Sequence, residues 1–365
     1  MTRVFLDDIE EIVSDSEISW ETLRDSAVLI TGATGGIGSA LACALRAADE
    51  KYDLNMNILA LARNMKRAAA LQHYGVKLIP QDIREPIIIP DPVDYIFHCA
   101  AMTKSPDMAL NPVEVAETAL KGSMNALKLA REKQIKSMVY LSSMEVYGQT
   151  EPSLMFVREG DLGYIDPLKA RSCYPESKKM CECLCECYHS EFFVPVKIAR
   201  LAQTFGAGVQ INDSRVYAQF AHSAIRNKDI VLHTDGQSRG NYCYISDAVR
   251  GLFLLLLKGE DGEAYNITNA AASMTIREMA ELVASMVCGG RVKVIVQEPA
   301  DIEKHGYSPV VSRRLSSEKI EQLGWKPKFN LTDMYERMIL DWRENNYEYS
   351  LNIRGRGRAA DEQQG

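Results

Sequence analysis

The short stretch YPESK begins with Tyr174 and ends with Lys178. At this spacing, a tyrosine and a lysine side chain could together transfer a proton. Side chains four positions apart project from the same face of a helix. A phenol has an unperturbed pKa of about 10 and is a poor base at neutral pH. A neighbouring ammonium and a positively charged nicotinamide ring would both favour the phenolate. The pair could therefore take the proton of an alcohol while a hydride leaves the same carbon.

A third residue with suitable chemistry, Ser143, ends the apolar run SMVYLSS at 137–143. Polar residues that follow a strand of a parallel α/β sheet lie at the edge where such folds bind ligands. Ser143 would hold the oxygen from which Tyr174 takes the proton. We therefore predict a catalytic group of Ser143, Tyr174 and Lys178.

Apolar runs that alternate with helical patterns must position these residues. The runs predicted to be strands cover 27–31, 57–62, 75–83, 93–101, 137–143 and 194–201. Each run is apolar throughout, which is typical of a parallel sheet covered on both faces. The pattern predicts a doubly wound α/β fold, a Rossmann sheet with a smaller, interleaved α/β lobe for the substrate.

The alternation weakens after about residue 202, which suggests how the chain is divided. We predict an N-terminal extension at 1–25 and a dinucleotide-binding Rossmann domain at 26–201, which also takes up about 241–265. The substrate-binding lobe would comprise about 202–240 and 266–345. The polar, Gly-rich end of the chain at 346–365 is expected to be disordered.

The stretch TGATGGIG follows the first predicted strand and opens a helix. Glycines in this context allow a tight turn and a close approach of the backbone to a pyrophosphate at the helix N-terminus. The position of this stretch between a strand and a helix therefore predicts a bound dinucleotide. The predicted cofactor-binding residues of this loop are Gly32, Thr34, Gly35, Gly36, Ile37 and Gly38.

The choice between NAD and NADP rests on the end of the second strand, ALARN, which carries no acid for a ribose hydroxyl. Arg63 could hold the 2′-phosphate of NADP, or it could simply be the solvated start of a helix. NAD is the expected cofactor, and NADP stays open.

Composition excludes several other classes of function. The net charge of −7 does not suit a nucleic-acid-binding protein. The N-terminus has no signal-peptide pattern, and no apolar run is long enough to span a membrane, so we expect a cytoplasmic protein with no membrane partner.

Nine cysteines without a secretory signal favour free thiols. In CECLCECYH (181–189) a helix would divide the four thiols between two faces, which disfavours a tetrahedral metal site, and no metal is predicted.

Taken in order, these motifs resemble the extended short-chain dehydrogenase/reductases, the NAD-dependent nucleotide-sugar epimerase/dehydratase family. The resemblance runs from about residue 26 to about 342 and includes TGATGGIG, QDI, FHCAA, LSSMEVYG, YPESK, RLAQTFGAG, YCYISDAV and LGWKP. It implies a nucleotide-sugar substrate that is transiently oxidised at C4, and a homodimer that pairs through the helices at 112–133 and 174–190. It also implies further cofactor contacts from Asp82, Ile83, Ala100, Ala101, Tyr174 and Lys178.

Within this family the triplet at 143–145 is closest to that of the UDP-glucuronate decarboxylases. The 4,6-dehydratases carry an aspartate at the position of Met144, which cannot donate a proton. The resemblance implies that Glu145 orients the sugar as a catalytic residue and that Arg171, ahead of the catalytic tyrosine, belongs to the decarboxylase pattern. The expected substrate-binding residues are Met144, Arg171, Gln203 and Arg239.

The chain also departs from the family pattern. Gln203 replaces an asparagine that contacts the substrate diphosphate, and Ala207 replaces a proline. Arg239 lies one position before the register of the decarboxylase arginine, which is Gly240 here. A 4-epimerase or a 4,6-dehydratase therefore remains an alternative to the decarboxylase. A non-catalytic dinucleotide-binding sensor is a remote one, because Ser143, Tyr174 and Lys178 are all present.

Overall fold

Seven parallel strands form the central sheet of the protein, whose computed structural model describes residues 1–297 and 313–345. Their order across the sheet is β10-β6-β5-β4-β1-β2-β3. The strands are β1 (Ala27–Thr31), β2 (Asn57–Ala62), β3 (Lys77–Pro80), β4 (Tyr95–His98), β5 (Ser137–Ser143), β6 (Val196–Leu201) and β10 (Ala264–Ile267). This order, with all pairs parallel, confirms the predicted Rossmann fold.

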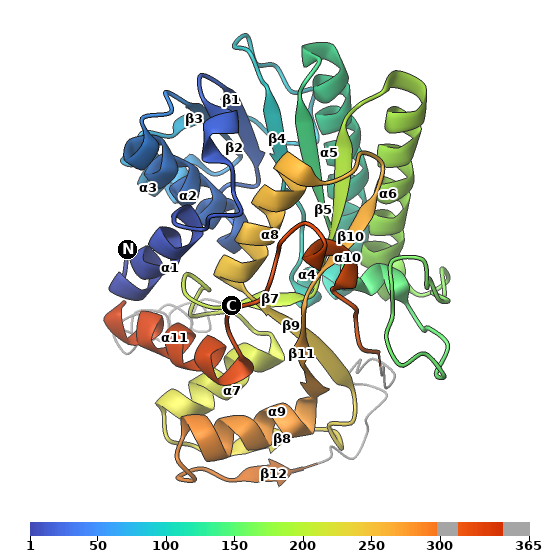
Figure 1. The fold of residues 1–365 in the computed structure, drawn as a ribbon. Coiled ribbons are helices and arrows are strands. Elements are labelled where there is room, and N and C mark those ends of the chain that lie inside the picture. Colours follow the sequence, from blue (N-terminus) through green and yellow to red (C-terminus); the bar gives the residue numbers. More distant parts are fainter. Residues whose placement is uncertain (298–312, 346–365) are drawn as a thin grey trace, which may run out of the picture.

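Helices cover both faces of this sheet, as Figure 1 shows. On one face α5 (Pro112–Lys133) and α6 (Cys173–Phe192) pack together, with a core that includes Leu127 and Cys185. On the other face α2 (Gly36–Tyr52) and α8 (Ile245–Lys258) pack against β1, β5 and β6. The helix α3 (Met65–Gln72) packs against β3 at the sheet edge. Because both faces are covered, apolar side chains on each strand can be buried in either direction.

The smaller lobe has two sheets of its own, seen at the bottom of Figure 1. The three-stranded sheet consists of β7 (Gln203–Phe205), β9 (Arg239–Tyr244) and β11 (Asn269–Thr275), and the two-stranded sheet of β8 (Ile230–Leu232) and β12 (Val294–Val296). Its helical segments are α7 (Val216–Ile225), α9 (Ile276–Leu282), η4 (Val283–Val287) and α11 (Leu331–Glu344). The chain enters this lobe after β6, returns with α8 and β10, and enters it again with β11, so the two lobes are interleaved as predicted.

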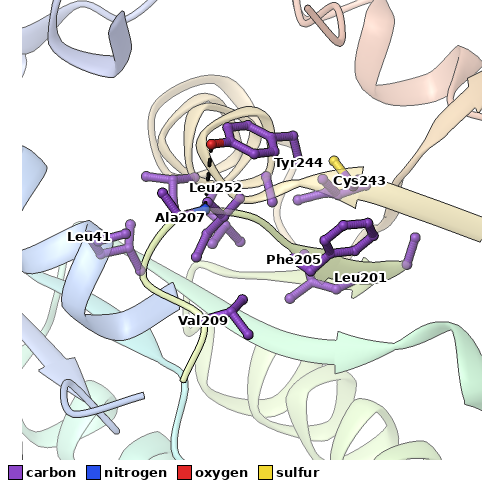
Figure 2. Packing of buried hydrophobic residues seen from close by; sticks show 14 of the residues in the cluster. Leu41, Leu201, Phe205, Ala207, Val209, Cys243, Tyr244 and Leu252 are labelled. Atoms are coloured by element: carbon purple, nitrogen blue, oxygen red, sulfur yellow. Dashed lines mark hydrogen bonds between the residues drawn. The ribbon is translucent and has the colours of Figure 1, made fainter. Parts of the chain in front are cut away.

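The junction between the lobes is apolar and closely packed (Figure 2). Phe205 and Val209, on either side of a turn after β7, join Leu41 of α2 and Leu252 of α8 in one buried cluster. The ring of Tyr244 lies so close to Gly206 that a Cβ there would come within 2.4 Å of it. A side chain at position 206 would therefore displace the Tyr244 ring within the sheet of the smaller lobe.

The N-terminal segment is an integral part of this junction. α1 (Arg3–Val13) buries Phe5, Ile9 and Ile12 and packs against α2, α8 and α11. Its Asp8 accepts a hydrogen bond from the hydroxyl of Tyr244, at 2.6 Å, and pairs with Arg337 of α11. The predicted extension at 1–25 thus connects both lobes.

Two further predictions concern the ends of the chain and its surroundings. The expected disordered segment at 346–365 lies outside the described residues. Within residues 1–297 and 313–345, every helix is too short or too polar to cross a bilayer. The domain boundaries proposed from the sequence stay predictions, although β10 extends the Rossmann sheet to Ile267.

Candidate active site

The glycine loop joins the end of β1 to the start of α2. The backbone around each of its glycines excludes a side chain to a different degree. Gly32 has a φ of +67°, and a Cβ there would lie 2.7 Å from the backbone nitrogen of Ala100. A Cβ on Gly38 would lie 2.4 Å from the carbonyl oxygen of Gly32. Gly35 has no such neighbour closer than 3.4 Å. The backbone therefore requires Gly32 and Gly38, whereas Gly35 leaves open space at the N-terminus of α2.

The space beside Gly35 suits a pyrophosphate. Gly36, Ile37 and Gly38 form the first turn of α2, whose leading N–H groups have no acceptor within the helix. Thr34 precedes them in the loop. Aligned N–H donors and the positive end of the helix dipole favour an anion at this point. The predicted cofactor loop is thus assembled as a cradle.

The end of β4 supports this loop from beside it. The backbone N–H of Ala100 donates to Thr31 Oγ1 at 3.2 Å, and His98 Nδ1 lies 2.7 Å from the same oxygen. Burial lowers the pKa of His98 to about 3, and the charge of Lys178 acts in the same direction. His98 is therefore neutral at physiological pH, and it fixes the Thr31 hydroxyl that holds Ala100, beside the predicted Ala101, against the loop.

At the far end of the predicted cofactor site, arginines and carboxylates form a small cluster. Arg63 Nη1 lies 3.7 Å from Asp82 and 3.8 Å from Glu114, and Arg84 also pairs with both acids. Hydrogen bonds from Arg84 lower the pKa of Asp82. Ile83 is buried beside Asp82. Arg63 thus already faces two carboxylates, which makes its surroundings unfavourable for the 2′-phosphate of NADP.

The predicted catalytic residues come together where β5 ends. Tyr174 and Lys178 lie in α6, both less than 10% exposed, with the Lys178 ammonium 6.0 Å from the centre of the Tyr174 ring. Lys178 Nζ donates to the carbonyl oxygen of Leu141, at 2.6 Å. Ser143, at the end of β5, is close enough to the Tyr174 hydroxyl to act on its pKa, which it lowers. The structure therefore brings all three side chains to one point.

The protonation of Tyr174 differs from the sequence-based expectation. Burial raises the pKa of Tyr174, and the charge of Glu145 adds to this effect. Ser143 and the charge of Arg171 act in the opposite direction but do not outweigh it. Lys178 is buried as well, and burial lowers its pKa. The phenolate is therefore not favoured by these residues alone, and the positive charge of an oxidised nicotinamide is needed to stabilise it.

The predicted substrate-binding residue Arg171 forms an ion pair with the predicted catalytic residue Glu145. Arg171 Nη2 lies 3.0 Å from a carboxylate oxygen of Glu145, which is in the 3₁₀ turn η2 (Met144–Tyr147) after Ser143. Met144, between Ser143 and Glu145, is buried. Glu145 is therefore fixed by a cation, and no proton donor occupies position 144.

Arg313 is a candidate that the sequence argument missed. Its Nε is buried without a hydrogen-bond partner among residues 1–297 and 313–345, while Nη1 donates to the carbonyl oxygen of Gly148 at 2.7 Å. Burial lowers its pKa, and the charge of Glu145 opposes that effect. A buried donor with no partner costs free energy unless a ligand satisfies it. The only signal in the sequence was the pair of arginines that precedes LSSEKIEQLGWKP.

The other two predicted substrate residues lie in the three-stranded sheet. Gln203 of β7 is opposite Tyr242 of β9, while Arg239 donates from Nη1 to the carbonyl oxygen of Ser273 at 2.9 Å. A Cβ at Gly240 would lie 2.2 Å from the Tyr242 hydroxyl, which explains why the arginine is not found at that position. Arg239 points towards β11, and its role in substrate binding stays a prediction.

A buried polar network, also unforeseen, lies behind these residues. Glu182, one turn after Lys178, accepts hydrogen bonds from Ser142 Oγ at 2.6 Å and from Arg200 Nη2 at 2.7 Å. Arg200 Nη1 also donates to the hydroxyl of Tyr147, at 3.1 Å. The network therefore joins α6, β5, β6 and η2, which carry the catalytic candidates.

A parallel sheet with a phosphate cradle and a buried Ser–Tyr–Lys group defines a dinucleotide-dependent enzyme that oxidises or reduces an alcohol carbon. Residues 28–268 match the model of the NAD dependent epimerase/dehydratase family. The chain belongs to this family. It is thus an NAD-dependent enzyme of nucleotide sugars.

Individual relatives agree with the family. UDP-glucuronic acid decarboxylase 3 of Arabidopsis thaliana is 32% identical over 324 residues, which cover 87% of this chain and 89% of that protein. Among solved structures, a UDP-glucose 4-epimerase from Thermotoga maritima superposes with a TM-score of 0.75 at 20% identity, covering 87% of this chain and 99% of that one. A dTDP-glucose 4,6-dehydratase from Streptomyces venezuelae, solved with NAD, gives 0.71 at 23% identity, with 87% and 97% covered. At these identities, the two structures show the shared fold.

Proposed function

We propose that this protein is a UDP-glucuronate decarboxylase, which converts UDP-glucuronate to a UDP-pentose and carbon dioxide. The observation that carries the proposal is the assembly at the end of β5. Ser143 meets Tyr174 and Lys178, the carboxylate of Glu145 is held by Arg171, and Met144 stands where a dehydratase needs an acid. The similarity to plant decarboxylases over most of the chain supports the same substrate.

The cofactor would be held by the glycine loop and by the residues after β4. NAD supplies a hydride acceptor at the sugar C4 and later returns that hydride. Tyr174 takes the proton from the C4 hydroxyl, and Ser143 holds the same oxygen through a hydrogen bond. Lys178 adds positive charge beside the phenol. These roles, like those of Asp82, Ile83, Ala100 and Ala101 in cofactor binding, are parts of the proposal.

Loss of carbon dioxide then follows from the chemistry of the oxidised sugar. A C4 ketone makes the C6 carboxylate a β-keto acid, so the C5–C6 bond breaks and its electron pair forms an enolate. A proton adds at C5, and the ketone is reduced at C4 as Tyr174 gives back its proton. No step requires departure of a hydroxyl group, so Met144 is compatible with this reaction.

Arg313 and Arg171 would recognise the negative charges of this substrate. The Nε of Arg313, near Glu145, has no partner within the described part of the chain, and a carboxylate or phosphate oxygen of the substrate would satisfy it. Arg171 has a side chain 40% exposed and can exchange its pairing with Glu145 for one with the substrate. Gln203 and Arg239, on the sheet of the smaller lobe, would contact the nucleotide portion.

Assembly and location complete the proposal. We place a homodimer contact on the outer faces of α5 and α6, where Val113 and Met124 are exposed apolar side chains. A cytoplasmic location suits nine cysteines that are all free.

The test is to incubate purified protein with NAD and UDP-glucuronate and to weigh the products by mass spectrometry. Loss of carbon dioxide is expected. An unchanged mass with an inverted sugar centre, detected by NMR, would instead identify a 4-epimerase. Loss of water from a UDP- or dTDP-hexose would identify a 4,6-dehydratase. Bound NAD without turnover of any nucleotide sugar would leave the non-catalytic sensor.

A further inference from the structure

Tyr140 of β5 is a buried tyrosine to which the proposed chemistry gives no role. It is 1% exposed, and burial raises its pKa, so the phenol is neutral. Its hydroxyl has no hydrogen-bond partner in the described part of the chain. The nearby thiol of Cys181 donates instead to the carbonyl oxygen of Ala119, at 3.3 Å. A buried hydroxyl without a partner costs free energy, so the ring must account for this residue.

The ring of Tyr140 lies against the ammonium of Lys178. Lys178 Nζ is 4.8 Å from the centre of the Tyr140 ring and 6.0 Å from that of Tyr174. At such distances an ammonium is attracted by the negative face of an aromatic ring, and the attraction is stronger where water is excluded. Lys178 is 4% exposed, and one of its three donors is used by the carbonyl oxygen of Leu141. Tyr140 is therefore the closer of the two aromatic partners of this buried cation.

The Tyr140 ring is itself held in place. The ring of His98, which is neutral, stacks on it with centroids 5.8 Å apart and an angle of 28° between the planes. His98 belongs to β4, the strand that pairs with β5, and His98 is directly opposite Tyr140 in the register. The position of the ring beneath Lys178 is thus fixed by the central sheet.

The other titratable groups around Lys178 offset little of its burial, which lowers the pKa of the lysine. These groups are His98, Cys99, Tyr140, Tyr174, Cys181, Glu182 and Cys185. Burial raises the pKa of Cys99 to about 12 and that of Cys185 well above its usual range, so both thiols are neutral. The carboxylate of Glu182 is paired with Arg200 at 2.7 Å. The aromatic ring is therefore the contact left to stabilise the ammonium.

We propose that Tyr140 is a positioning residue for Lys178, whose ammonium its ring holds beside Tyr174 by a cation–π contact. This inference rests on the proposed function, in which Lys178 adds positive charge beside the phenol. Without the ring, the charged form of Lys178 loses an attraction and its pKa falls further. A neutral lysine no longer favours the phenolate of Tyr174, so activity would be lost at a lower pH than in the wild type.

The test is the pH dependence of kcat with saturating NAD and UDP-glucuronate. Activity that requires the ammonium is lost as the pH rises through the pKa of Lys178, so the alkaline limb of the profile reports this group. Tyr140→Leu removes the ring and should move that limb to lower pH by roughly 0.5–1.5 units. Tyr140→Phe, the matched control, removes only the unpartnered hydroxyl and should leave the limb in place. A purely structural role would lower kcat equally at every pH.

A second variant separates the charge of the ring face from its volume, because Tyr140→Leu also leaves a cavity. A fluorinated phenylalanine introduced at position 140 fills the site, while its fluorine atoms withdraw electrons from the ring face. It should move the alkaline limb in the same direction as Tyr140→Leu but less far. An unmoved limb in both variants would overturn the inference. So would a limb moved by Tyr140→Phe, since the hydroxyl would then be responsible.

Failure of this inference can be distinguished from failure of the proposed function. Wild-type protein that releases carbon dioxide, together with unmoved limbs in the variants, contradicts only the role of Tyr140. If the wild type instead epimerises or dehydrates a nucleotide sugar, decarboxylation is wrong. The same profiles recorded with that sugar then decide the role of Tyr140, because each of these reactions begins with oxidation at C4. Turnover of no nucleotide sugar overturns both.

Discussion

At the scale of single residues, Tyr174 is the centre of the proposed chemistry. Its hydroxyl can be removed by substitution while its aromatic ring is kept. Tyr174→Phe should reduce kcat by about 10²–10⁴-fold, because general acid–base catalysis contributes about this much. NAD binding should be unchanged, since the cradle at α2 does not involve the hydroxyl. Product formation by mass spectrometry and NAD affinity by calorimetry check both parts. Turnover close to that of the wild type would remove Tyr174 from the mechanism.

Gly35 offers a second test at this scale because its surroundings separate folding from binding. The nearest atom to a Cβ at this position is 3.4 Å away, so Gly35→Val should fold and keep its thermal midpoint within a few degrees. The valine methyls would occupy the space of the pyrophosphate, and NAD affinity should fall at least tenfold. Gly38→Ala is the contrasting variant. Its Cβ would lie 2.4 Å from the Gly32 carbonyl oxygen, so it should lose stability as well. Normal NAD affinity in Gly35→Val would contradict the loop assignment.

At the scale of elements, the sequence was informative wherever a strand is buried on both faces. The runs at 27–31, 57–62 and 137–143 are strands with the predicted bounds, whereas 75–83 and 93–101 are strands only at 77–80 and 95–98. The excess residues in these two runs lie in loops that pack on the sheet, such as Ile83, which is buried without being in a strand. Apolar composition reports burial, not the backbone conformation.

What the sequence could not show are contacts between distant elements. Motifs located the glycine loop, Ser143, Tyr174 and Lys178, because each follows a strand or shares a helix face. Arg313 and the pair Glu182–Arg200 join segments with no common motif, so only the folded chain places them. For the same reason the pKa of Tyr174 was expected to fall and is instead raised by burial.

The Glu182–Arg200 network predicts that breaking a buried ion pair lowers the stability of this protein more than breaking an exposed one. Glu182→Gln leaves the Arg200 charge buried without a counter-charge, which should lower the free energy of unfolding by about 3–5 kcal/mol. It should also lower kcat more than it changes KM, because Ser142 and Lys178 lie next to the catalytic atoms. Urea denaturation and steady-state kinetics measure these effects.

The matched control for this variant is Glu318→Gln, which breaks the exposed pair with Arg158. Exposed pairs contribute at most about 1 kcal/mol, so this variant should behave as the wild type does. If Glu182→Gln is equally mild, the network does not position the catalytic residues.

At the scale of the whole molecule, α1 makes stability depend on pH. Burial raises the pKa of Asp8 from 3.8 to about 6, although hydrogen bonding to Tyr244 and the charge of Arg337 oppose this. The folded state thus binds the proton of Asp8 more tightly than the unfolded state does. Its contribution to stability is present in full below about pH 3.8 and is lost as the pH rises through about 6, by about 3 kcal/mol in total.

Asp8→Asn removes this titration. Its free energy of unfolding, measured in urea at several pH values, should fall less between pH 4 and 6 than that of the wild type. Asp7→Asn, on the exposed side of the same helix, should keep the wild-type dependence. Parallel curves for Asp8→Asn and wild type would show that Asp8 is ionised in the folded protein throughout this range.

The contacts of α1 also have a consequence for the order of synthesis. Asp8 pairs with Arg337, and Thr2 with Asp341, across 329 and 339 residues of chain. A ribosome adding roughly 5–20 residues per second needs on the order of tens of seconds to produce α11 after α1 has emerged. Throughout this time the apolar face of α1 lacks the last of its partners. Although α1 is translated long before α11, it is therefore secured late, and a chain released early would expose it to chaperones and proteases.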